Sequence, residues 1–128
     1  MSFRTLTLPV KDRFLVNMTQ KILIVDDETD FCLIMKNYFV KKGYEVSLAY
    51  TLKEGLATLK EIRPDILFLD NNLPDGHGWD AINQIVEIIP QIRALLVSAH
   101  RSDSPHSPSA NVVVWEKPIS FSALNTVF

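Results

Sequence analysis

The chain has 128 residues, of which 47% are hydrophobic and 22% are charged, and its formal net charge is −2. This length suits one globular domain with a single core, and so small a net charge gives no electrostatic basis for binding nucleic acid or a membrane surface. The single cysteine, Cys32, excludes an internal disulfide, no apolar run approaches the roughly 18 residues of a membrane span, and a reducing cytoplasm is the expected compartment.

Residues 1–17 precede the first strand-like run and lack the continuous apolar stretch of a signal peptide. Met18 is a natural start for the domain that follows. We therefore expect residues 1–17 to be an N-terminal extension outside the core, and residues 18–128 to form one domain. Its last helix is expected to be short, because the chain stops within about two or three turns of Ser120.

A strand, a helix and a second strand are predicted first. Lys21–Val25 is a fully apolar run without alternation, which is typical of a central parallel strand covered on both faces. Thr29–Lys42 carries apolar side chains at helical spacing, and Gly43 provides a C-terminal stop. Glu45–Ala49 alternates as an edge strand does.

A second helix is predicted by the capping box at Thr51–Glu54, in which a hydroxyl and a carboxylate satisfy backbone N–H groups at the helix start. Its apolar face extends to Ile62. The remaining predicted elements are strands at Asp65–Leu69, Arg93–Val97 and Val112–Trp115 and helices at Trp79–Ile89 and Ser120–Phe128.

The segment Arg101–Asn111, RSDSPHSPSAN, has two prolines and four serines in eleven residues. This composition disfavours a regular helix, so the fourth helix of the domain is expected to be short or irregular. Strands that alternate with helices imply right-handed crossovers and a parallel sheet with helices on both faces. The predicted fold is therefore a doubly wound α/β domain with five parallel strands.

Polar residues follow several of the predicted strands. Asp26 and Asp27 follow the first strand, Asp70 the third and Ser98 the fourth, and Lys117 comes after the fifth. In an open parallel sheet, sites form beyond the carboxyl ends of the strands. Two carboxylates about 5 Å apart repel by roughly 3 kcal/mol at an effective dielectric of 20, which Mg²⁺ and a lysine would offset. The cluster predicts an anion site with Asp70 as a carboxylate nucleophile able to accept a phosphoryl group.

Four segments, ILIVDDE, LFLDNNLPDGHG, LLVSAH and EKPI, stand in the order and roughly the spacing of a known signature. Together they resemble the receiver domains of two-component response regulators, over residues 20–128. The resemblance implies a flavodoxin-like sheet with strand order 2-1-3-4-5. It also implies a Mg²⁺-dependent signalling domain rather than a turnover enzyme, with self-catalysed phosphotransfer and dephosphorylation at most.

Carried over by position, the resemblance implies that Asp70 is the phosphoacceptor. Asp27 is similar to the direct Mg²⁺ ligand of the family, and Asp26 to a ligand that acts directly or through water. The backbone carbonyl of Asn72 matches the third protein ligand. Nothing else in the chain is implied to bind a cofactor.

The family pattern also assigns residues that contact the phosphoryl group. Ser98 matches the hydroxyl residue and Lys117 the lysine that pairs with the group, while Gly78 is expected to serve a backbone conformation that other residues resist. The implied donor is a sensor histidine kinase or a histidine phosphotransfer protein. Because no output domain follows Phe128, the signal would pass to a downstream protein partner, unless the chain is a fragment of a longer regulator.

The sequence departs from the family pattern near the fifth strand. Val114 stands three residues before Lys117, where the family usually has an aromatic residue, and Trp115 comes one residue later, which would place it on the opposite face of the sheet. The interval from Ser98 to Lys117 is about three residues shorter than expected. We hypothesise that phosphorylation is signalled differently here, by ordering the segment Arg101–Asn111.

Other interpretations remain open at this point. A receiver-like module could dock partners without phosphorylation, and an aspartyl phosphohydrolase would need a second acid where Asn72 stands. Taken singly, Asp26 is also consistent with a helix N-cap, and Asp75 and His77 with polar turn residues.

Overall fold

The computed structural model describes residues 19–99 and 111–128. Five parallel strands form its main sheet, in the order β2-β1-β3-β6-β7. These strands are β1 (Lys21–Val25), β2 (Glu45–Ala49), β3 (Ile66–Asp70), β6 (Arg93–Ser98) and β7 (Val112–Glu116). Counted along the chain, the order is 2-1-3-4-5, so the predicted flavodoxin-like topology is confirmed. The predicted N-terminal extension and the Ser/Pro-rich residues 101–110 lie outside the described residues.

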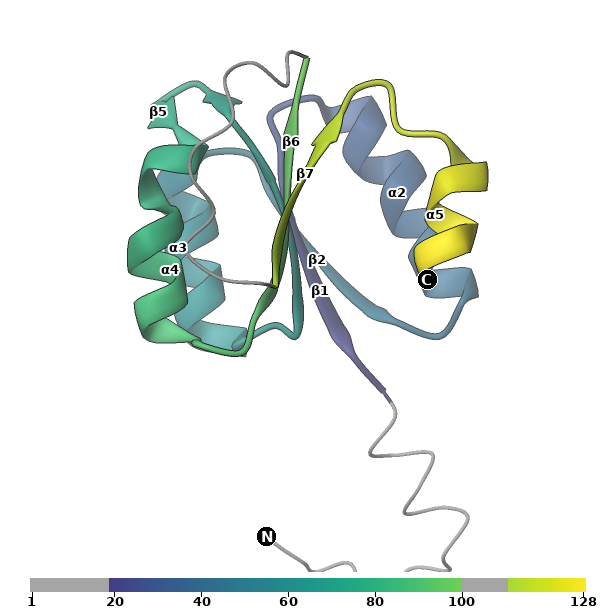
Figure 1. Cartoon of the computed structure of the whole chain (residues 1–128), viewed down its shortest axis with the longest axis horizontal. Helices are drawn as coiled ribbons and strands as arrows, with labels where there is room; N and C mark the ends of the chain where they lie inside the picture. Colours follow the sequence, from purple (N-terminus) through teal and green to yellow (C-terminus); the bar gives the residue numbers. More distant parts are fainter. Residues whose placement is uncertain (1–18, 100–110) are drawn as a thin grey trace, which may run out of the picture.

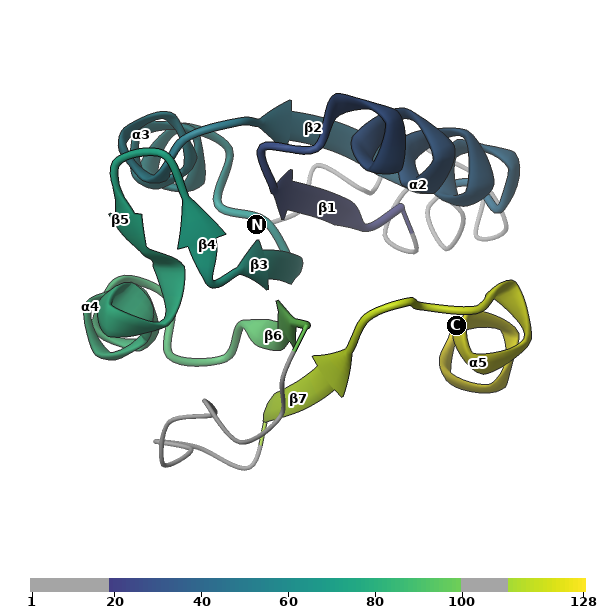
Figure 2. The same ribbon diagram turned by 90° about the horizontal axis from the view of Figure 1, so that it is seen from above.

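In the part of the chain that the structure describes, two α-helices cover each face of the sheet (Figures 1 and 2). Helices α2 (Thr29–Lys41) and α5 (Phe121–Val127) lie on one face, and α3 (Leu52–Ile62) and α4 (Ile82–Ile88) on the other. The helix predicted over Trp79–Ile89 begins instead as a 3₁₀ turn, η2 (Gly78–Ala81), and becomes α-helical only at Ile82. Within the described residues, no helix is long and apolar enough to cross a membrane.

Alternate residues of the central strands pack into two separate hydrophobic clusters. Leu23 and Leu67 belong to the cluster beneath α3 and α4, whereas Ile22 and Ile66 belong to the cluster beneath α2 and α5. Burial on both faces explains why these strands are apolar runs without alternation. We call the two groups the α3/α4 cluster and the α2/α5 cluster.

The same alternation separates the two unusual residues of β7. Val114 packs against the α3/α4 cluster and Trp115 against the α2/α5 cluster. Their strand partners are Leu96 and Val97, in a register without a slip. The prediction that Trp115 and Val114 face opposite sides of the sheet is therefore confirmed.

The start of α3 is held from both sides. The Thr51 hydroxyl accepts a hydrogen bond from the Glu54 backbone N–H at 3.1 Å, as the capping box predicts. The Glu54 carboxylate, however, accepts from the N–H of Tyr50 at 2.9 Å, one residue before the N-cap. Helix α3 also packs closely on the sheet, since a Cβ at Gly55 would lie 2.8 Å from the Val25 side chain.

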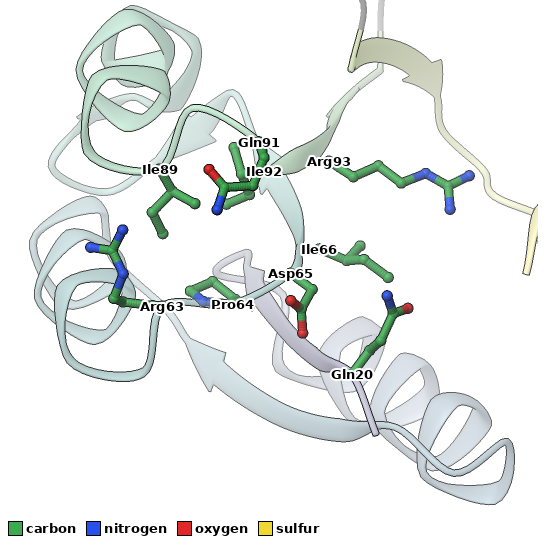
Figure 3. A pocket seen from close by; sticks show the side chains of 9 residues that line it. All are labelled: Gln20, Arg63, Pro64, Asp65, Ile66, Ile89, Gln91, Ile92 and Arg93. Carbon is green, nitrogen blue, oxygen red and sulfur yellow. The ribbon is translucent and has the colours of Figure 1, made fainter. Parts of the chain in front are cut away.

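A pocket of about 260 Å³ lies at the amino edge of the sheet, where β1 begins (Figure 3). Its charged side chains are engaged in internal contacts. Arg63 donates to the Ile88 carbonyl at 3.1 Å, the Asp65 carboxylate accepts from the Lys21 N–H at 2.9 Å, and the Arg93 guanidinium lies 4.6 Å from the centroid of the Phe128 ring. The first contact joins the end of α3 to α4, the second joins β1 to the residue before β3, and the third joins the start of β6 to the last residue of the chain. Among residues 19–99 and 111–128, the one group of three acidic side chains lies elsewhere.

Candidate functional site

The polar residues singled out from the sequence meet at the carboxyl edge of the sheet, the upper edge in Figure 1. Asp26 and Asp27 directly follow β1, Asp70 ends β3, Ser98 ends β6 and Lys117 follows β7. Strand β3 lies between β1 and β6, so these residues belong to adjacent strands. Parallel strands present their carboxyl ends at one edge, which brings residues distant in the sequence together.

Three carboxylates form a compact acidic cluster. One oxygen each from Asp26, Asp27 and Asp70 lies within 4.8 Å of the others. The Asp26 and Asp70 residues are 2% and 5% exposed, while Asp27 is open to solvent. Octahedral Mg²⁺, with bonds of about 2.0–2.1 Å, needs oxygens roughly 3–4 Å apart and retains several waters. The hard oxygen ligands, their spacing and the solvent-facing side therefore fit a hydrated Mg²⁺ ion.

Asp26 has two roles in this geometry. Its Oδ1 accepts a hydrogen bond from the Glu28 backbone N–H at 2.9 Å, which orders the residues just before α2. Its Oδ2 lies 3.0 Å from Lys117 Nζ. The suggestion that Asp26 is a helix N-cap was wrong, because Glu28 occupies the N-cap position of α2 and Asp26 Oδ1 accepts only from the backbone of that residue.

Lys117 is the cation of the cluster. Its Nζ lies 2.5 Å from Glu28 Oε1, 3.0 Å from Asp26 Oδ2 and 3.8 Å from Asp70 Oδ1. Its backbone N–H donates to the Ser98 carbonyl at 2.8 Å, which links the two strand ends. Burial disfavours the charged ammonium, but hydrogen bonds to Glu28 and Asp26 outweigh burial and raise the pKa of Lys117 above its usual value.

The acceptor candidate has a perturbed acidity. Burial, followed by the nearby Asp26 charge, raises the pKa of Asp70 to about 6, and Lys117 opposes this shift only in part. Burial likewise raises the pKa of Asp26. Burial and a neighbouring negative charge make the ionised form of these carboxyl groups unfavourable. A bound cation would stabilise that ionised form.

The chain after Asp70 forms a short antiparallel hairpin, β4 (Asn72–Leu73) with β5 (Gly76–His77). Asn71 fastens its base, because its N–H donates to the Val97 carbonyl at 3.2 Å and its carbonyl accepts from the Gly78 N–H at 2.9 Å. The exposed Asn72, whose carbonyl was expected to bind metal, thus starts the strand that leaves the acidic cluster.

The expected reason for Gly78 was wrong. Its backbone is not in the left-handed region, which among the described glycines is occupied by Gly43 and Gly76. Instead, a Cβ at position 78 would lie 2.1 Å from the Asp70 carbonyl oxygen. The position requires glycine because the chain passes directly over the backbone of the acceptor candidate.

Asp75 has a wider role than the polar turn residue expected from the sequence. Its carboxylate accepts hydrogen bonds from the backbone N–H groups of Leu52 at 2.7 Å and Lys53 at 2.9 Å. These bonds lower the pKa of Asp75. The hairpin after Asp70 is thereby attached to the first turn of α3, as its position beside α3 in Figure 2 indicates.

Substituting Asp75 with alanine should release this attachment. We expect the amide hydrogens of Leu52 and Lys53 to exchange with solvent about tenfold faster, because each loses its carboxylate acceptor. Hydrogen exchange followed by NMR measures this directly. Unchanged exchange at both amides would contradict the assignment, and the amides of α2 serve as an internal control.

Glu28 was not among the site residues predicted from the sequence, although it belongs to the segment ILIVDDE. The structure places its carboxylate against Lys117. Glutamate after two aspartates carries no local signal for this contact, because its partner is 89 residues away in the chain.

Comparison with known proteins adds independent evidence. Residues 22–115 match the family model described as the response regulator receiver domain. The chain is 36% identical over 83 residues to the chemotaxis protein CheY of Thermotoga maritima, covering 64% of this chain and 69% of that protein. It is 30% identical over 83 residues to sporulation initiation phosphotransferase F of Bacillus subtilis, covering 65% of this chain and 67% of that protein.

Solved structures have the same architecture. A CheY-like receiver domain from Methanospirillum hungatei JF-1 superposes with a TM-score of 0.77 at 27% identity, over 85% of this chain and 90% of that chain. The response regulator TrrA of Thermotoga maritima, solved in complex with Mg²⁺–BeF, has a TM-score of 0.75 at 23% identity, over 85% of this chain and 96% of that one. With the family match over most of its length, the chain belongs to the response regulator receiver domain family.

Proposed function

We propose that this domain accepts a phosphoryl group on Asp70 from a histidine kinase or a histidine phosphotransfer protein, in a Mg²⁺-dependent reaction. The observation that carries the proposal is the convergence of Asp26, Asp27 and Asp70 within 4.8 Å, with the Lys117 ammonium against them. Burying several negative charges together costs free energy unless a bound cation offsets their repulsion, so such a cluster indicates a binding site.

Mg²⁺ would be held by Asp26, Asp27, Asp70 and the backbone carbonyl of Asn72. Bound there, the ion would neutralise charge on the oxygens of the transferring phosphoryl group. A family relative has been solved with Mg²⁺ and beryllofluoride, which supports this choice of ion. The oxygen-only donor set favours Mg²⁺ over the softer metals that prefer nitrogen or sulfur ligands.

The residues of this chain have distinct parts in the transfer. A carboxylate oxygen of Asp70 forms the new O–P bond while the P–N bond to the donor imidazole breaks, and the leaving nitrogen keeps the electron pair and takes a proton from solvent. Lys117 supplies positive charge 3.8 Å from the acceptor oxygen, and Ser98 supplies a hydroxyl at the end of the adjacent strand. Such catalysis consists of positioning and charge neutralisation. Attack of water on phosphorus would later break the P–O bond to Asp70, release inorganic phosphate and regenerate the carboxylate. The domain would thus act as a phosphoacceptor with self-catalysed phosphotransfer and dephosphorylation at most.

An apolar groove beside Lys117 supports docking of a protein donor. It measures about 520 Å³, and its apolar lining consists of Phe31, Ile34, Met35, Pro118, Ile119 and Phe121. Ile34 and Phe121 are 53% and 48% exposed. A donor protein seated there would lie next to the lysine that contacts the acidic cluster. We propose that this exchange takes place in the cytoplasm, the compartment expected for a chain with a single cysteine and therefore no internal disulfide.

A second candidate function is docking of partners without phosphorylation. It is favoured by Val114, which occupies the usual aromatic position of the family, and by the orientation of Trp115 to the other face. Under this alternative the acidic cluster would have no role. The alternative therefore predicts no response to metal or phosphodonor.

Incubation with Mg²⁺ and phosphoramidate should add one phosphoryl group to the protein, because the small donor needs no kinase. Intact-mass spectrometry measures the product, and peptide mapping after borohydride trapping should locate it at Asp70. The reaction in excess chelator is the control and should give no adduct. A protein that stays unmodified at saturating Mg²⁺ would favour the docking alternative.

A further inference from the structure

Lys117 makes its shortest contacts with residues other than the proposed acceptor. An ammonium has three N–H donors, and here Nζ lies 2.5 Å from Glu28 Oε1 and 3.0 Å from Asp26 Oδ2. Its 3.8 Å separation from Asp70 Oδ1 is an ion-pair distance but is too long for a hydrogen bond. The unphosphorylated site therefore holds its cation toward one side.

Glu28 is free to hold the lysine. It precedes the first residue of α2, and within the described residues its carboxylate does not cap that helix. Its side chain is 62% exposed, whereas that of Lys117 is 19% exposed. The lysine also lies 5.0 Å from the centroid of the Phe31 ring, an arrangement that favours a cation over the ring face. Glu28 and Phe31 thus form a cradle outside the three-carboxylate cluster.

We infer that Glu28 is a positioning residue that holds Lys117 away from Asp70 in the resting protein, so that phosphorylation must draw the lysine out of this cradle. The inference rests on the proposed phosphoacceptor function. A phosphoryl group on Asp70 adds negative charge and extends the acceptor toward the lysine, which can then exchange the Glu28 carboxylate for a phosphoryl oxygen. Glu28 would consequently lower the stability of the phosphorylated state, and it would help to set how readily Asp70 is phosphorylated.

The substitution Glu28→Gln tests this role, with beryllofluoride in saturating Mg²⁺ as the probe for the phosphorylated state. We expect the variant to bind beryllofluoride about three- to fivefold more tightly than the wild type by isothermal titration calorimetry, which is the size expected for removing an exposed ion pair. Asp30→Asn is the matched control. Asp30 is an exposed acid in the first turn of the same helix, and no described ion pair joins it to Lys117.

A Lys117→Ala background separates positioning from simple repulsion between Glu28 and the anion. If Glu28 acts by holding the lysine, Glu28→Gln should have no effect on beryllofluoride affinity once the lysine is absent. An equal gain in both backgrounds, or an equal gain from Asp30→Asn, would overturn the inference. So would an unchanged affinity in Glu28→Gln when the wild type binds normally.

A second measurement does not require the proposed function. In the metal-free protein, the side-chain ¹⁵N resonance of the Lys117 ammonium should shift in Glu28→Gln and stay unchanged in Asp30→Asn. Failure of the wild type to bind Mg²⁺ and beryllofluoride would refute the proposed function, whereas an unshifted ammonium resonance would refute the cradle.

Discussion

Replacing Asp70 with asparagine should abolish phosphorylation by phosphoramidate and, at the same time, stabilise the metal-free protein by about 2–3 kcal/mol at pH 7. The first effect follows because an amide lacks the nucleophilic carboxylate oxygen. The second follows because folding raises the pKa of Asp70 from 3.8 to about 6, and each unit is equivalent to about 1.4 kcal/mol. Asparagine keeps the shape of the side chain without its charge.

The sign of the pH dependence follows from the same shift. Between pH 4 and 6 the folded protein binds this proton more tightly than the unfolded chain, so the free energy of unfolding should decrease as the pH rises through this window. The raised pKa of Asp26 contributes in the same direction. Below pH 4 both states are protonated, and the penalty disappears. In Asp70→Asn the decrease should be smaller by the contribution of this one group.

Urea denaturation of the metal-free proteins at pH 4, 5, 6 and 7 measures these differences. Asp30→Asn is the control, because its exposed carboxylate lies outside the acidic cluster. Saturating Mg²⁺ should stabilise the wild type more than Asp70→Asn, since binding to the folded state adds to stability by mass action. A metal-free Asp70→Asn protein no more stable than the wild type at pH 7 would refute the electrostatic account of the cluster.

Substituting Gly78 with alanine should cost about 2–3 kcal/mol of stability and weaken Mg²⁺ binding. The added Cβ would lie 2.1 Å from the Asp70 carbonyl oxygen and 3.0 Å from a methyl of Leu69. Neither the hairpin base nor β3 can move freely, because Asn71 is hydrogen-bonded to both Val97 and Gly78. Overpacking against a backbone that cannot relax typically costs about 2–3 kcal/mol. Any movement of the Asp70 backbone that relieved the contact would displace the acceptor carboxylate.

Gly43→Ala provides the comparison that separates steric contact from backbone conformation. Gly43 has a φ of +95°, and a Cβ there would meet nothing within 4 Å. Its substitution should cost only about 1 kcal/mol, the usual penalty for a side chain at positive φ, and should leave Mg²⁺ affinity unchanged. Chemical denaturation and calorimetric titration of both variants measure the two effects. A Gly78→Ala protein that matches Gly43→Ala in both respects would contradict the close-approach argument.

The fold could be predicted from the sequence because its strands and helices have strong local patterns. The apolar run of β1 and the helical spacing of α2 led to boundaries within one residue of those observed. Strand β3 was predicted one residue too early, because a charged residue suggested the strand end, whereas Asp70 itself pairs with Val97. The backbone pairing with β6, and not the charge of the side chain, places Asp70 within the strand.

The candidate site was only partly accessible from the sequence. Acidic residues at strand ends indicated the cluster, since parallel topology fixes where strand ends meet. The contacts of Asp75 with α3 and of Glu28 with Lys117 join residues 22–23 and 89 positions apart. Exposed acids are common, and no local spacing distinguishes those with distant partners. Three-dimensional placement was needed to find both.

The opposite orientations of the two tryptophans have an experimental consequence. Trp79, 4% exposed, lies in the α3/α4 cluster, and Trp115 packs at the margin of the α2/α5 cluster. These are the only tryptophans of the chain. Variants that retain one indole each would therefore carry an intrinsic optical reporter on one side of the sheet. Comparing their emission spectra would follow a structural change separately through each layer of the molecule.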